Sequence, residues 1–536
     1  MIKQEEIAKR RTVAIISHPD AGKTTLTEKL LLYGGALQLA GSVTARKKEQ
    51  STSSDWMELE RKRGISVNST LLQFQYNGFH VNLLDTPGHR DFSEDTYRVL
   101  TAVDSVFMVL DAGKGIELQT LKLFEICRLR QIPIFTFINK MDRPAKEPLA
   151  VLDEIDQQLQ LHTFPVNWPI GMGKDFKGIL DRRTRQLHSF ERVPGGAFRA
   201  PVTVLDCHSV LDSGIDPDIL KKAMDESAML DAVCEPFSAD AIRAGDMTPV
   251  FFGSAMNNFG IQLLLDGFLE LSCPPRPQRA INGAVSPDDP RFSGFVFKIQ
   301  SNMDPRHRDQ LAFMRICSGR FERDMRVYHS RTGETIRLSS SHKLLGRERE
   351  TVDEAYAGDV VGIIGHSQFR VGDTLSQDKS IVFKDIPRFL PEHLSYIFCA
   401  DTAQMKRFRT GLEHLLQEGV VQTFSLRGAA AAAPLLGAVG PLQFDVLEYR
   451  LNAEYGAKSK LEPAPWRVVR WVSAACVNLM RDDMLMSGAR LAQDESGRLV
   501  VLFVEEWDCA YFLRQHPEIS LLTLPPDAVF SAPNND

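Results

Sequence analysis

Short apolar runs alternate with amphipathic stretches through the first half of the chain. Each run is about as long as a strand that is buried on both faces, and helices join such strands in parallel sheets. The pattern therefore predicts a parallel α/β sheet between residues 12 and 255. The predicted strands read TVAIIS, FHVNLLD, SVFMVLD, IPIFTFINK and TPVFFGSA.

One pair of runs departs from this parallel order. TLLQFQY and FHVNLLD flank Asn77 and Gly78, a dipeptide that is typical of tight two-residue hairpins. The pattern thus predicts one antiparallel strand at the edge of the sheet. Residues 171–246 show weaker periodicity, which indicates an insertion in this first domain.

The pattern changes at Cys273–Pro277, a proline-rich stretch that no helix can cross. Short apolar runs separated by Gly-Asp turns follow, and they are typical of a small antiparallel β-barrel. Beyond Pro387, helical segments at 406–417 and around 444–451 alternate with strand-like segments, which predicts an α+β unit. We therefore expect three domains.

Composition and charge restrict the classes of function. Of the 536 residues, 43% are hydrophobic, 25% charged and 8% aromatic, which is typical of globular proteins and excludes disordered and fibrous classes. The net charge of -6 provides no overall basic field, so contacts with RNA would have to come from local patches. Basic clusters lie at residues 46–48 and 61–63 and at Lys406, Arg407 and Arg409, although charge runs are more often solvated faces.

The cysteines and the first residues bear on the cellular compartment. The eight cysteines contain no C-x-x-C pair, which argues against a disulfide framework and a zinc site and favours a reducing compartment. The early apolar run TVAII is too short for a signal-peptide core or a membrane span. We expect a cytoplasmic protein without a membrane partner.

A phosphate-loop pattern follows the first predicted strand directly and precedes the helical sequence TTLTEKLLLY. In such a loop, backbone N–H groups bind phosphate oxygens, Lys23 neutralises the β- and γ-phosphates, and the Thr24 hydroxyl is a ligand for Mg²⁺. The predicted loop consists of Ser17, in place of the usual first glycine, with His18, Pro19, Asp20, Ala21, Gly22, Lys23 and Thr24.

A second motif closes the predicted strand FHVNLLD. Because the carboxyl ends of parallel strands meet at one edge of a sheet, Asp85 is expected beside the phosphate loop, where it would support the Mg²⁺ shell. The N–H of Gly88 would contact the γ-phosphate. The motif consists of Asp85, Thr86, Pro87, Gly88 and His89, and taken alone it is also compatible with an ordinary Asp-x-Pro-Gly turn.

A third motif ends the strand IPIFTFINK. The carboxylate of Asp142 is complementary to the N1–H and the exocyclic amine of guanine, which adenine lacks. The three motifs in this order predict a guanine-nucleotide site, whereas a P-loop kinase or ATPase would not need the third. The predicted base contacts are Asn139, Lys140, Met141 and Asp142, with a backbone contact from Ser254 and Ala255.

The motif set SHPDAGKTT, SDWMELERKRGIS, DTPGH and NKMD resembles the translational GTPases, in the branch that contains elongation factor G and release factor three. Within that branch, FSEDTYR, FKIQSNMDPRHRDQLAFMR and GAVGPLQFDVLEYRL resemble the bacterial release factor three family. The likeness extends over nearly the whole chain. It implies an α/β P-loop GTP-binding domain at 1–279, an antiparallel β-barrel domain at 280–385 and an α+β C-terminal domain at 386–536.

The resemblance also implies an activity and its partners. Members of the family are ribosome-dependent GTPases that hydrolyse GTP to GDP and phosphate and promote the dissociation of class I release factors at translation termination. GTP or GDP and Mg²⁺ would be the ligands, and the rRNA and proteins of the ribosome would be partners of a monomeric chain. By resemblance, Ser66 is a Mg²⁺ ligand, His89 orients the attacking water and Lys23 assists catalysis, while Arg90 departs from the branch.

Two alternatives remain open at this stage. The chain contains no Gly-Gly-Gln, so we expect it to assist termination without hydrolysing peptidyl-tRNA. No residues follow the third domain for the extra domains of elongation factor G, which leaves a translocase as the alternative within the class. A non-hydrolytic scaffold for ribosome assembly is the alternative from another class, and loss of Lys23 or His89 would favour it. We expect residues 46–66, rich in serine and charge, to be mobile without a partner.

Overall fold

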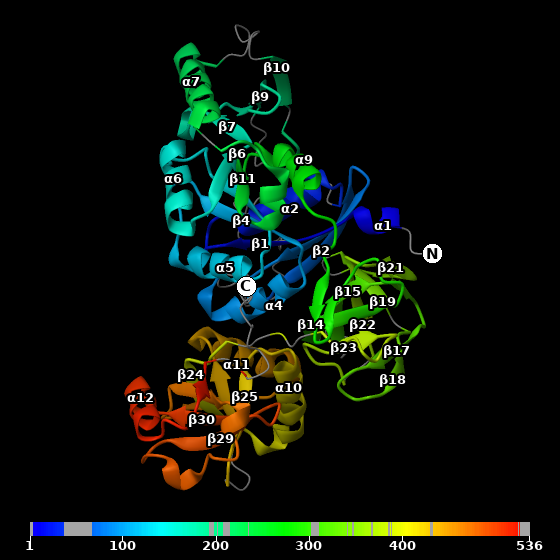
Figure 1. Cartoon of the computed structure of the whole chain (residues 1–536), viewed down its shortest axis with the longest axis vertical. Helices are drawn as coiled ribbons and strands as arrows, with labels where there is room; N and C mark the ends of the chain where they lie inside the picture. The colour runs from blue at the N-terminus through cyan, green and yellow to red at the C-terminus, as the bar shows by residue number, and fades with distance from the viewer. Residues whose placement is uncertain are drawn as a thin grey trace.

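The computed structural model has three connected parts, coloured from blue to red along the chain in Figure 1. The first part lies at the top of that view, the second at the lower right and the third at the bottom. The structure describes residues 4–36, 67–191, 198–200, 202–206, 215–233, 235–301, 310–339, 341–345, 348–365, 368–383, 386, 389–428, 433–523 and 525.

The first part is a mostly parallel sheet with the order β2-β3-β1-β4-β5-β11-β6, as the apolar runs predict. Every neighbouring pair is parallel except β2 and β3, which form the predicted hairpin. Asn77 and Gly78 both have positive φ there, at 47° and 80°, as a tight hairpin turn requires. The strands are β1 (Arg10–Ser17), β2 (Thr70–Tyr76), β3 (Phe79–Asp85), β4 (Ser105–Asp111), β5 (Ile134–Asn139), β6 (His162–Pro165) and β11 (Met247–Phe252).

Helices cover both faces of this sheet, which explains why β1, β4, β5 and β11 are buried along their whole length. Side chains of α2, α8 and α9 share one core cluster with the sheet, and those of α4, α5 and α6 share another. On the first face, Phe268 of α9 packs against Phe107 and Phe135 at ring-centroid distances of 4.7 and 5.1 Å. The helices are α1 (Gln4–Ala8), α2 (Lys23–Tyr33), α4 (Ser93–Thr101), α5 (Leu118–Leu129), α6 (Pro148–Leu159), α8 (Ala239–Ala244) and α9 (Ile261–Leu271).

The segment with weak periodicity forms a small antiparallel sheet of its own, at the top of Figure 1. Its strands lie in the order β10-β9-β8-β7, and Trp168 of β7 is fully buried against Phe252 at 5.2 Å between ring centroids. The elements are β7 (Asn167–Ile170), β8 (Gly178–Asp181), β9 (Gln186–Phe190), β10 (Val202–Asp206) and α7 (Pro217–Val233).

The second part is the predicted antiparallel barrel domain, with its own core of buried aliphatic and aromatic side chains. A backbone pair between Leu345 and Leu72 joins it to β2 of the first part. Strand β12 spans the boundary proposed between residues 279 and 280. The strands are β12 (Gln278–Ala280), β13 (Gly283–Val285), β14 (Ser293–Ser301), β15 (Gln310–Ser318), β16 (Arg320–Glu322), β17 (Arg326–His329), β18 (Thr335–Arg337), β19 (Ser341–Leu345), β20 (Glu348–Thr351), β21 (Glu354–Tyr356), β22 (Val360–Ile364) and β23 (Thr374–Ser376).

The third part is an antiparallel sheet with helices packed on it, in agreement with the predicted α+β unit. The sheet order is β27-β24-β26-β25-β29-β30-β28-β31, and Phe408, Leu412 and Leu415 of the predicted helix are buried. The elements are β24 (His393–Cys399), α10 (Met405–Gln417), β25 (Gln422–Leu426), β26 (Leu435–Ala438), α11 (Pro441–Tyr455), β27 (Ser459–Pro463), β28 (Val468–Val472), β29 (Arg490–Asp494), β30 (Leu499–Phe503), α12 (Glu506–Gln515) and β31 (Leu521–Leu522).

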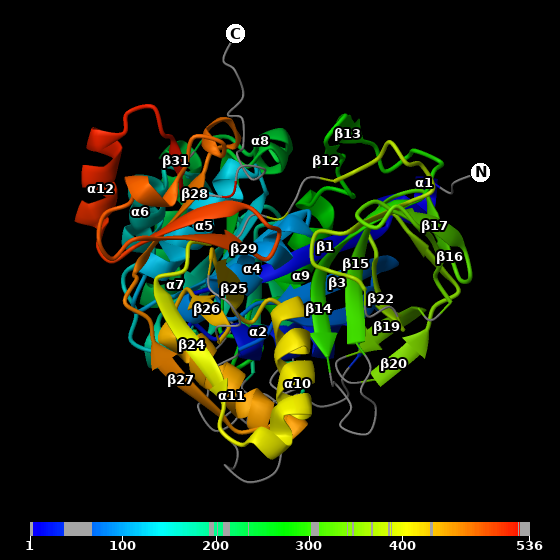
Figure 2. The ribbon, with the colours of Figure 1, turned by 90° about the horizontal axis from the view of Figure 1, so that it is seen from below.

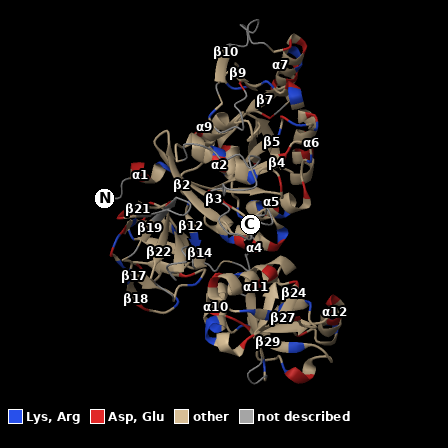
Figure 3. Ribbon diagram, turned by 180° about the vertical axis from the view of Figure 1, so that it is seen from behind, with Lys and Arg blue, Asp and Glu red and all other residues tan. Residues whose placement is uncertain are grey.

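Seen from below, the second and third parts lie side by side beneath the first (Figure 2). Both signs of charge are interspersed along all three parts (Figure 3). None of the helices in the described ranges combines the length and the apolar character that crossing a bilayer requires.

Candidate functional site

The predicted phosphate loop lies between β1 and α2. Asp20 and Gly22 take left-handed backbone conformations, with φ of 66° and 96°, and α2 begins at Lys23. A Cβ atom at Gly22 would overlap the Asn139 amide, so both the backbone angle and the packing require glycine here. The loop therefore ends in a helix N-terminus with free N–H groups, a geometry that suits phosphate oxygens.

Lys23 and Asp85 face each other at the carboxyl edge of the sheet. The Lys23 ammonium donates to Asp85 Oδ1 at 2.6 Å, and both side chains are buried. Thr24 lies half-buried in the first turn of α2, next to this pair in sequence. A hydroxyl and a carboxylate oxygen are ligands of the kind that Mg²⁺ takes together with substrate phosphates, so the residues present fit that ion. Ser66, like the rest of residues 46–66, lies outside the described residues.

The turn that carries His89 contacts the phosphate loop. A Cβ atom at Gly88 would lie 3.7 Å from Pro19 N and 3.8 Å from the His18 carbonyl oxygen. The Thr86 hydroxyl donates to the Ile15 carbonyl of β1 at 2.5 Å and holds the start of the turn. His89 follows at the border of buried and exposed surface, where it caps the 3-10 helix η1 (Arg90–Phe92).

Asn139 connects the three segments expected to hold the nucleotide. Its side-chain amide donates to the Ala21 carbonyl of the phosphate loop at 2.8 Å. Its Oδ1 accepts from the N–H of Ala255 at 2.9 Å and from that of Lys140 at 2.8 Å. One buried side chain thus sets the spacing between the phosphate loop, the third motif and the loop after β11.

The Asp142 carboxylate has a buried oxygen that lacks a hydrogen-bond partner in the described part of the chain. An unpartnered buried oxygen is costly, since it gives up its bonds to water without replacement. Guanine has two adjacent N–H donors and could supply the hydrogen bond that this oxygen lacks. The Met141 N–H donates to the Gly253 carbonyl at 3.1 Å, and Ser254 Oγ accepts from Asn257, so these neighbours are held by the protein itself.

Asp111 belongs to this site and was not predicted. Its carboxylate accepts from Lys140 Nζ at 2.7 Å and from the Gly113 N–H at 2.9 Å. Burial opposes ionisation, but these hydrogen bonds outweigh it and hold the pKa of Asp111 below its usual value. Its position at the carboxyl end of SVFMVLD was a usable signal, because the other motifs end strands in the same way.

His18 is the most buried titratable side chain of the phosphate loop, at 1% exposure. Burial lowers the pKa of its imidazole, so the ring is neutral near pH 7. Both ring nitrogens are buried without a hydrogen-bond partner among the described residues. A neutral imidazole can donate with one nitrogen and accept with the other, so the loop offers both functions to a ligand.

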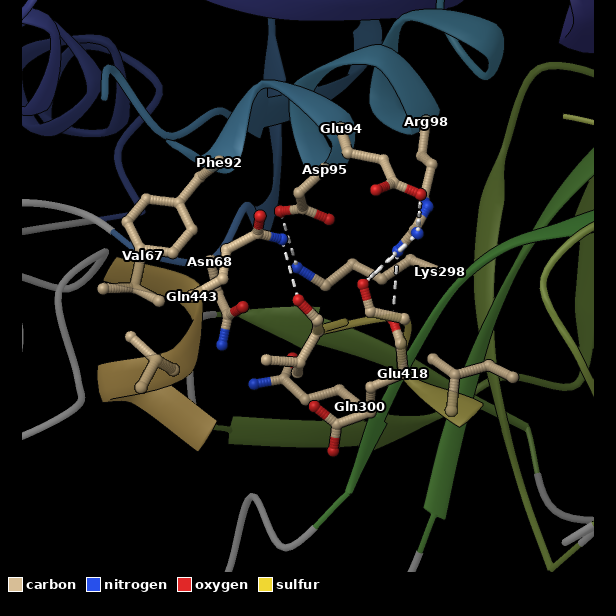
Figure 4. A pocket seen from close by; sticks show the side chains of 14 residues that line it. Val67, Asn68, Phe92, Glu94, Asp95, Arg98, Lys298, Gln300, Glu418 and Gln443 are labelled. Carbon is tan, nitrogen blue, oxygen red and sulfur yellow. Dashed lines mark hydrogen bonds and ion pairs between the residues drawn. The ribbon is translucent and has the colours of Figure 1, made fainter. Parts of the chain in front are cut away.

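The helix that follows His89 lies at a junction of all three domains. There α4 meets β14 of the barrel and the segment between α10 and α11, around a cavity of about 30 Å³ (Figure 4). Arg98 of α4 donates to the carbonyls of Glu418 at 3.1 Å and Gly419 at 3.3 Å, and it also pairs with Glu94. Lys298 of the barrel donates to Ser69 at 2.6 Å and lies 3.4 Å from Asp95.

No motif predicted this junction. Only the pair of Glu94 and Arg98 has a sequence signal, the i,i+4 spacing on one helix. The other partners are more than 200 positions apart along the chain. The basic residues Lys406, Arg407 and Arg409 lie exposed on α10, and the clusters at 46–48 and 61–63 lie outside the described residues.

Three family models match consecutive parts of the chain. The elongation factor Tu GTP binding domain matches residues 8–273, and elongation factor G domain 2 matches residues 291–378. The model described as class II release factor RF3, C-terminal domain, matches residues 383–513.

Curated proteins named peptide chain release factor 3 are similar to the chain over nearly its full length. The protein of Synechococcus elongatus is 50% identical over 531 residues, which cover 99% of this chain and 95% of that protein. The protein of Gloeobacter violaceus is 50% identical over 527 residues, covering 97% and 98% of the two chains. A solved structure from Thermus thermophilus shares the fold, with a TM-score of 0.67 at 22% identity over 91% of this chain and 72% of that one.

Proposed function

Because the chain belongs to the peptide chain release factor 3 family, we propose that it uses GTP hydrolysis on the ribosome to promote the departure of class I release factors. The chain is a translational GTPase of the termination step, with a guanine-nucleotide-binding domain.

We propose that Lys23 and the loop from Ser17 to Thr24 bind the phosphates, with Mg²⁺ held by Thr24, Asp85 and Ser66. Lys23 Nζ lies 2.6 Å from Asp85 Oδ1, so the phosphates bound by Lys23 would lie next to the Mg²⁺ ion held by Asp85. Asp142 would select guanine, because its buried oxygen lacks a hydrogen-bond donor and guanine could supply one.

Within this proposal, His89 orients the attacking water and does not bind GTP in the ground state. The backbone of the turn before it touches the phosphate loop at Pro19, which supports a place beside the γ-phosphate. A neutral imidazole can accept a proton from water with one nitrogen while the other is held by the protein.

The contact between α4 and the C-terminal domain is the observation that supports a coupling between GTP hydrolysis and the binding of a partner. The helix begins four residues after His89, and its Arg98 is bound to Glu418 and Gly419. A change of the turn at His89 on hydrolysis would be transmitted through α4 and Arg98 to the C-terminal domain. Such coupling, typically about 1–3 kcal/mol, changes a partner's affinity about 5- to 150-fold.

The proposed partners are the ribosome and, through it, the class I release factors, with the chain acting as a monomer in the cytoplasm. Exposed Lys406, Arg407 and Arg409 on α10 are the described basic residues that we propose for rRNA phosphates. Salt should weaken that contact.

The experiment follows labelled class I release factor on ribosomes after peptide release. We expect dissociation to accelerate with GTP plus this protein and Lys23→Ala to abolish the acceleration, since the phosphates lose their cation. GTP turnover should be slow alone and fast with ribosomes. Unchanged dissociation with messenger RNA advancing by one codon would instead support a translocase.

A further inference from the structure

Asp91 lies two residues after His89, and its two carboxylate oxygens contact two different domains. Its Oδ1 and its backbone N–H both lie 3.3 Å from His89 Nδ1, which accepts from the N–H when it carries no proton and donates to Oδ1 when it carries one. Its Oδ2 accepts from the N–H of Leu442 at 2.9 Å, although 351 positions separate the two residues. The side chain is only 10% exposed. Asp91 therefore connects the imidazole of His89 directly to the C-terminal domain.

The Gln443 side chain caps helix α11 by accepting from the N–H groups of Val439 and Gly440 at 2.7 and 3.2 Å. Asp91 supplies the acceptor for Leu442 from another domain. The N-cap position is Gly440, which has no side chain to accept a hydrogen bond, and Pro441 has no N–H. Leu442 therefore supplies the first free N–H of the helix, and Asp91 accepts it from outside the domain. The negative carboxylate is also favoured by the positive end of the helix dipole.

The Asp91 carboxyl group packs directly against the backbone of Gly440. A Cβ atom at Gly440 would overlap all three atoms of the Asp91 carboxyl group. The backbone of Gly440 is extended, with φ of -147°, so only this overlap and no backbone strain requires glycine there. Phe92 and Val446 form a small buried apolar cluster beside it and hold η1 against α11.

We propose that Asp91 is a positioning residue through which the C-terminal domain holds His89 in place for GTP hydrolysis. Residues 440–442, at the start of α11, fix the carboxylate, and the carboxylate accepts from the Nδ1–H of His89, which leaves Nε2 unprotonated to accept from water. The inference rests on the proposed role of His89. It adds that residues of the C-terminal domain, remote in sequence from the nucleotide motifs, control the rate of the chemical step.

Gly440→Ala tests the inference from the far side of the contact. The added methyl displaces the Asp91 carboxyl group without changing any residue of the GTP-binding domain. On saturating ribosomes we expect Asp91→Ala and Gly440→Ala each to slow single-turnover GTP hydrolysis about 10- to 100-fold, as misplacement of a reacting group does. GTP affinity should stay within about twofold, because only the group acting in the transition state is disturbed.

The double variant adds an independent criterion. If both substitutions act through one contact, their effects are not additive, and Asp91→Ala with Gly440→Ala should be no slower than the slower single variant. Asp91→Asn keeps an acceptor for Leu442 and should lose less activity than Asp91→Ala. Because asparagine has nearly the same shape as aspartate, Asp91→Asn is the folded variant to compare if Gly440→Ala melts at a much lower temperature.

Glu392→Ala is the matched control in the C-terminal domain. It removes the exposed pair between Glu392 and Arg90, 2.7 Å apart, which crosses the same two domains without touching Asp91. Turnover should stay within about twofold of the wild type, since exposed pairs contribute little. A loss of turnover equal to that of Gly440→Ala would overturn the inference, because loosening any contact between the two domains would then be enough to slow GTP hydrolysis.

Three further results would overturn it. One is wild-type turnover in Gly440→Ala, another is faster turnover, and the third is a loss of GTP affinity that accounts for the loss of rate. Failure of the proposed function has a different signature: no ribosome stimulation of the wild type, or wild-type turnover in His89→Ala. That signature removes both proposals, whereas wild-type turnover in Gly440→Ala alone removes only this one.

Discussion

Glu418 provides a quantitative test of the three-domain junction. Its carboxylate accepts from Arg450 at 2.5 and 3.1 Å within the C-terminal domain and from the N–H of Ser301 in the barrel at 2.7 Å. Its backbone carbonyl accepts from Arg98 of the GTP-binding domain. We predict that Glu418→Ala loosens α11 and β14 while the rest of the fold stays intact.

The magnitude follows from the burial of the pair. Arg450 and Glu418 are 1% and 4% exposed, so Glu418→Ala leaves a buried guanidinium whose remaining partner among the described residues is Glu454, at 2.6 Å. Removing one member of a buried pair costs about 3–5 kcal/mol, and a remaining partner lowers the expected cost here to about 2–4 kcal/mol. At about 1.4 kcal/mol per tenfold, local opening becomes about 30- to 700-fold more frequent.

Hydrogen exchange read by mass spectrometry measures this opening. Peptides from α11 and β14 should exchange about 30- to 700-fold faster in Glu418→Ala, whereas peptides from α12, away from the junction, should not change. Glu392→Ala, which breaks an exposed pair, should accelerate exchange less than about fivefold. Acceleration of α11 below about fivefold in Glu418→Ala would refute the reasoning, since a buried charge left with one partner must cost more than that.

Three other predictions concern the nucleotide site and the barrel. Asp142→Asn should weaken GTP and favour xanthosine triphosphate, whose O2 accepts from the new amide; unchanged preference in competition binding would contradict the assignment. Lys23→Ala should lose nucleotide in equilibrium binding, whereas His89→Ala should bind GTP normally and lose ribosome-stimulated turnover. In the barrel, burial opposes ionisation of Asp373, but hydrogen bonds from His329 and its neighbours lower its pKa. Its stabilisation is therefore present above the unfolded pKa of about 4 and is lost progressively as the pH falls below it, and Asp373→Asn should flatten that loss in melting curves recorded on the acid side of about pH 4.

The strands and the nucleotide motifs could be predicted because their signals are local. A run such as SVFMVLD is apolar throughout because helices cover both faces of its strand, and Asn77 with Gly78 specifies the hairpin by backbone conformation alone. The three motifs end parallel strands of one sheet, β1, β3 and β5, so topology alone predicts that they meet at one edge. Asp111 follows the same rule and was overlooked only because it stands outside a recognised motif.

The junction and the second role of Asp91 could not be predicted, because their partners are set by how whole domains dock. No local period relates Asp91 to Leu442 or Arg98 to Glu418, which lie 351 and 320 positions apart. A carboxylate near His89 has the same sequence signature whether it is solvated or caps a helix of another domain. The sequence by itself determined the three folds and the chemistry of the nucleotide motifs, since strand burial, turn conformation and ligand type are properties of short segments. Only the tertiary structure decided which buried charge meets which helix end, since that depends on the shape of complete surfaces packed together.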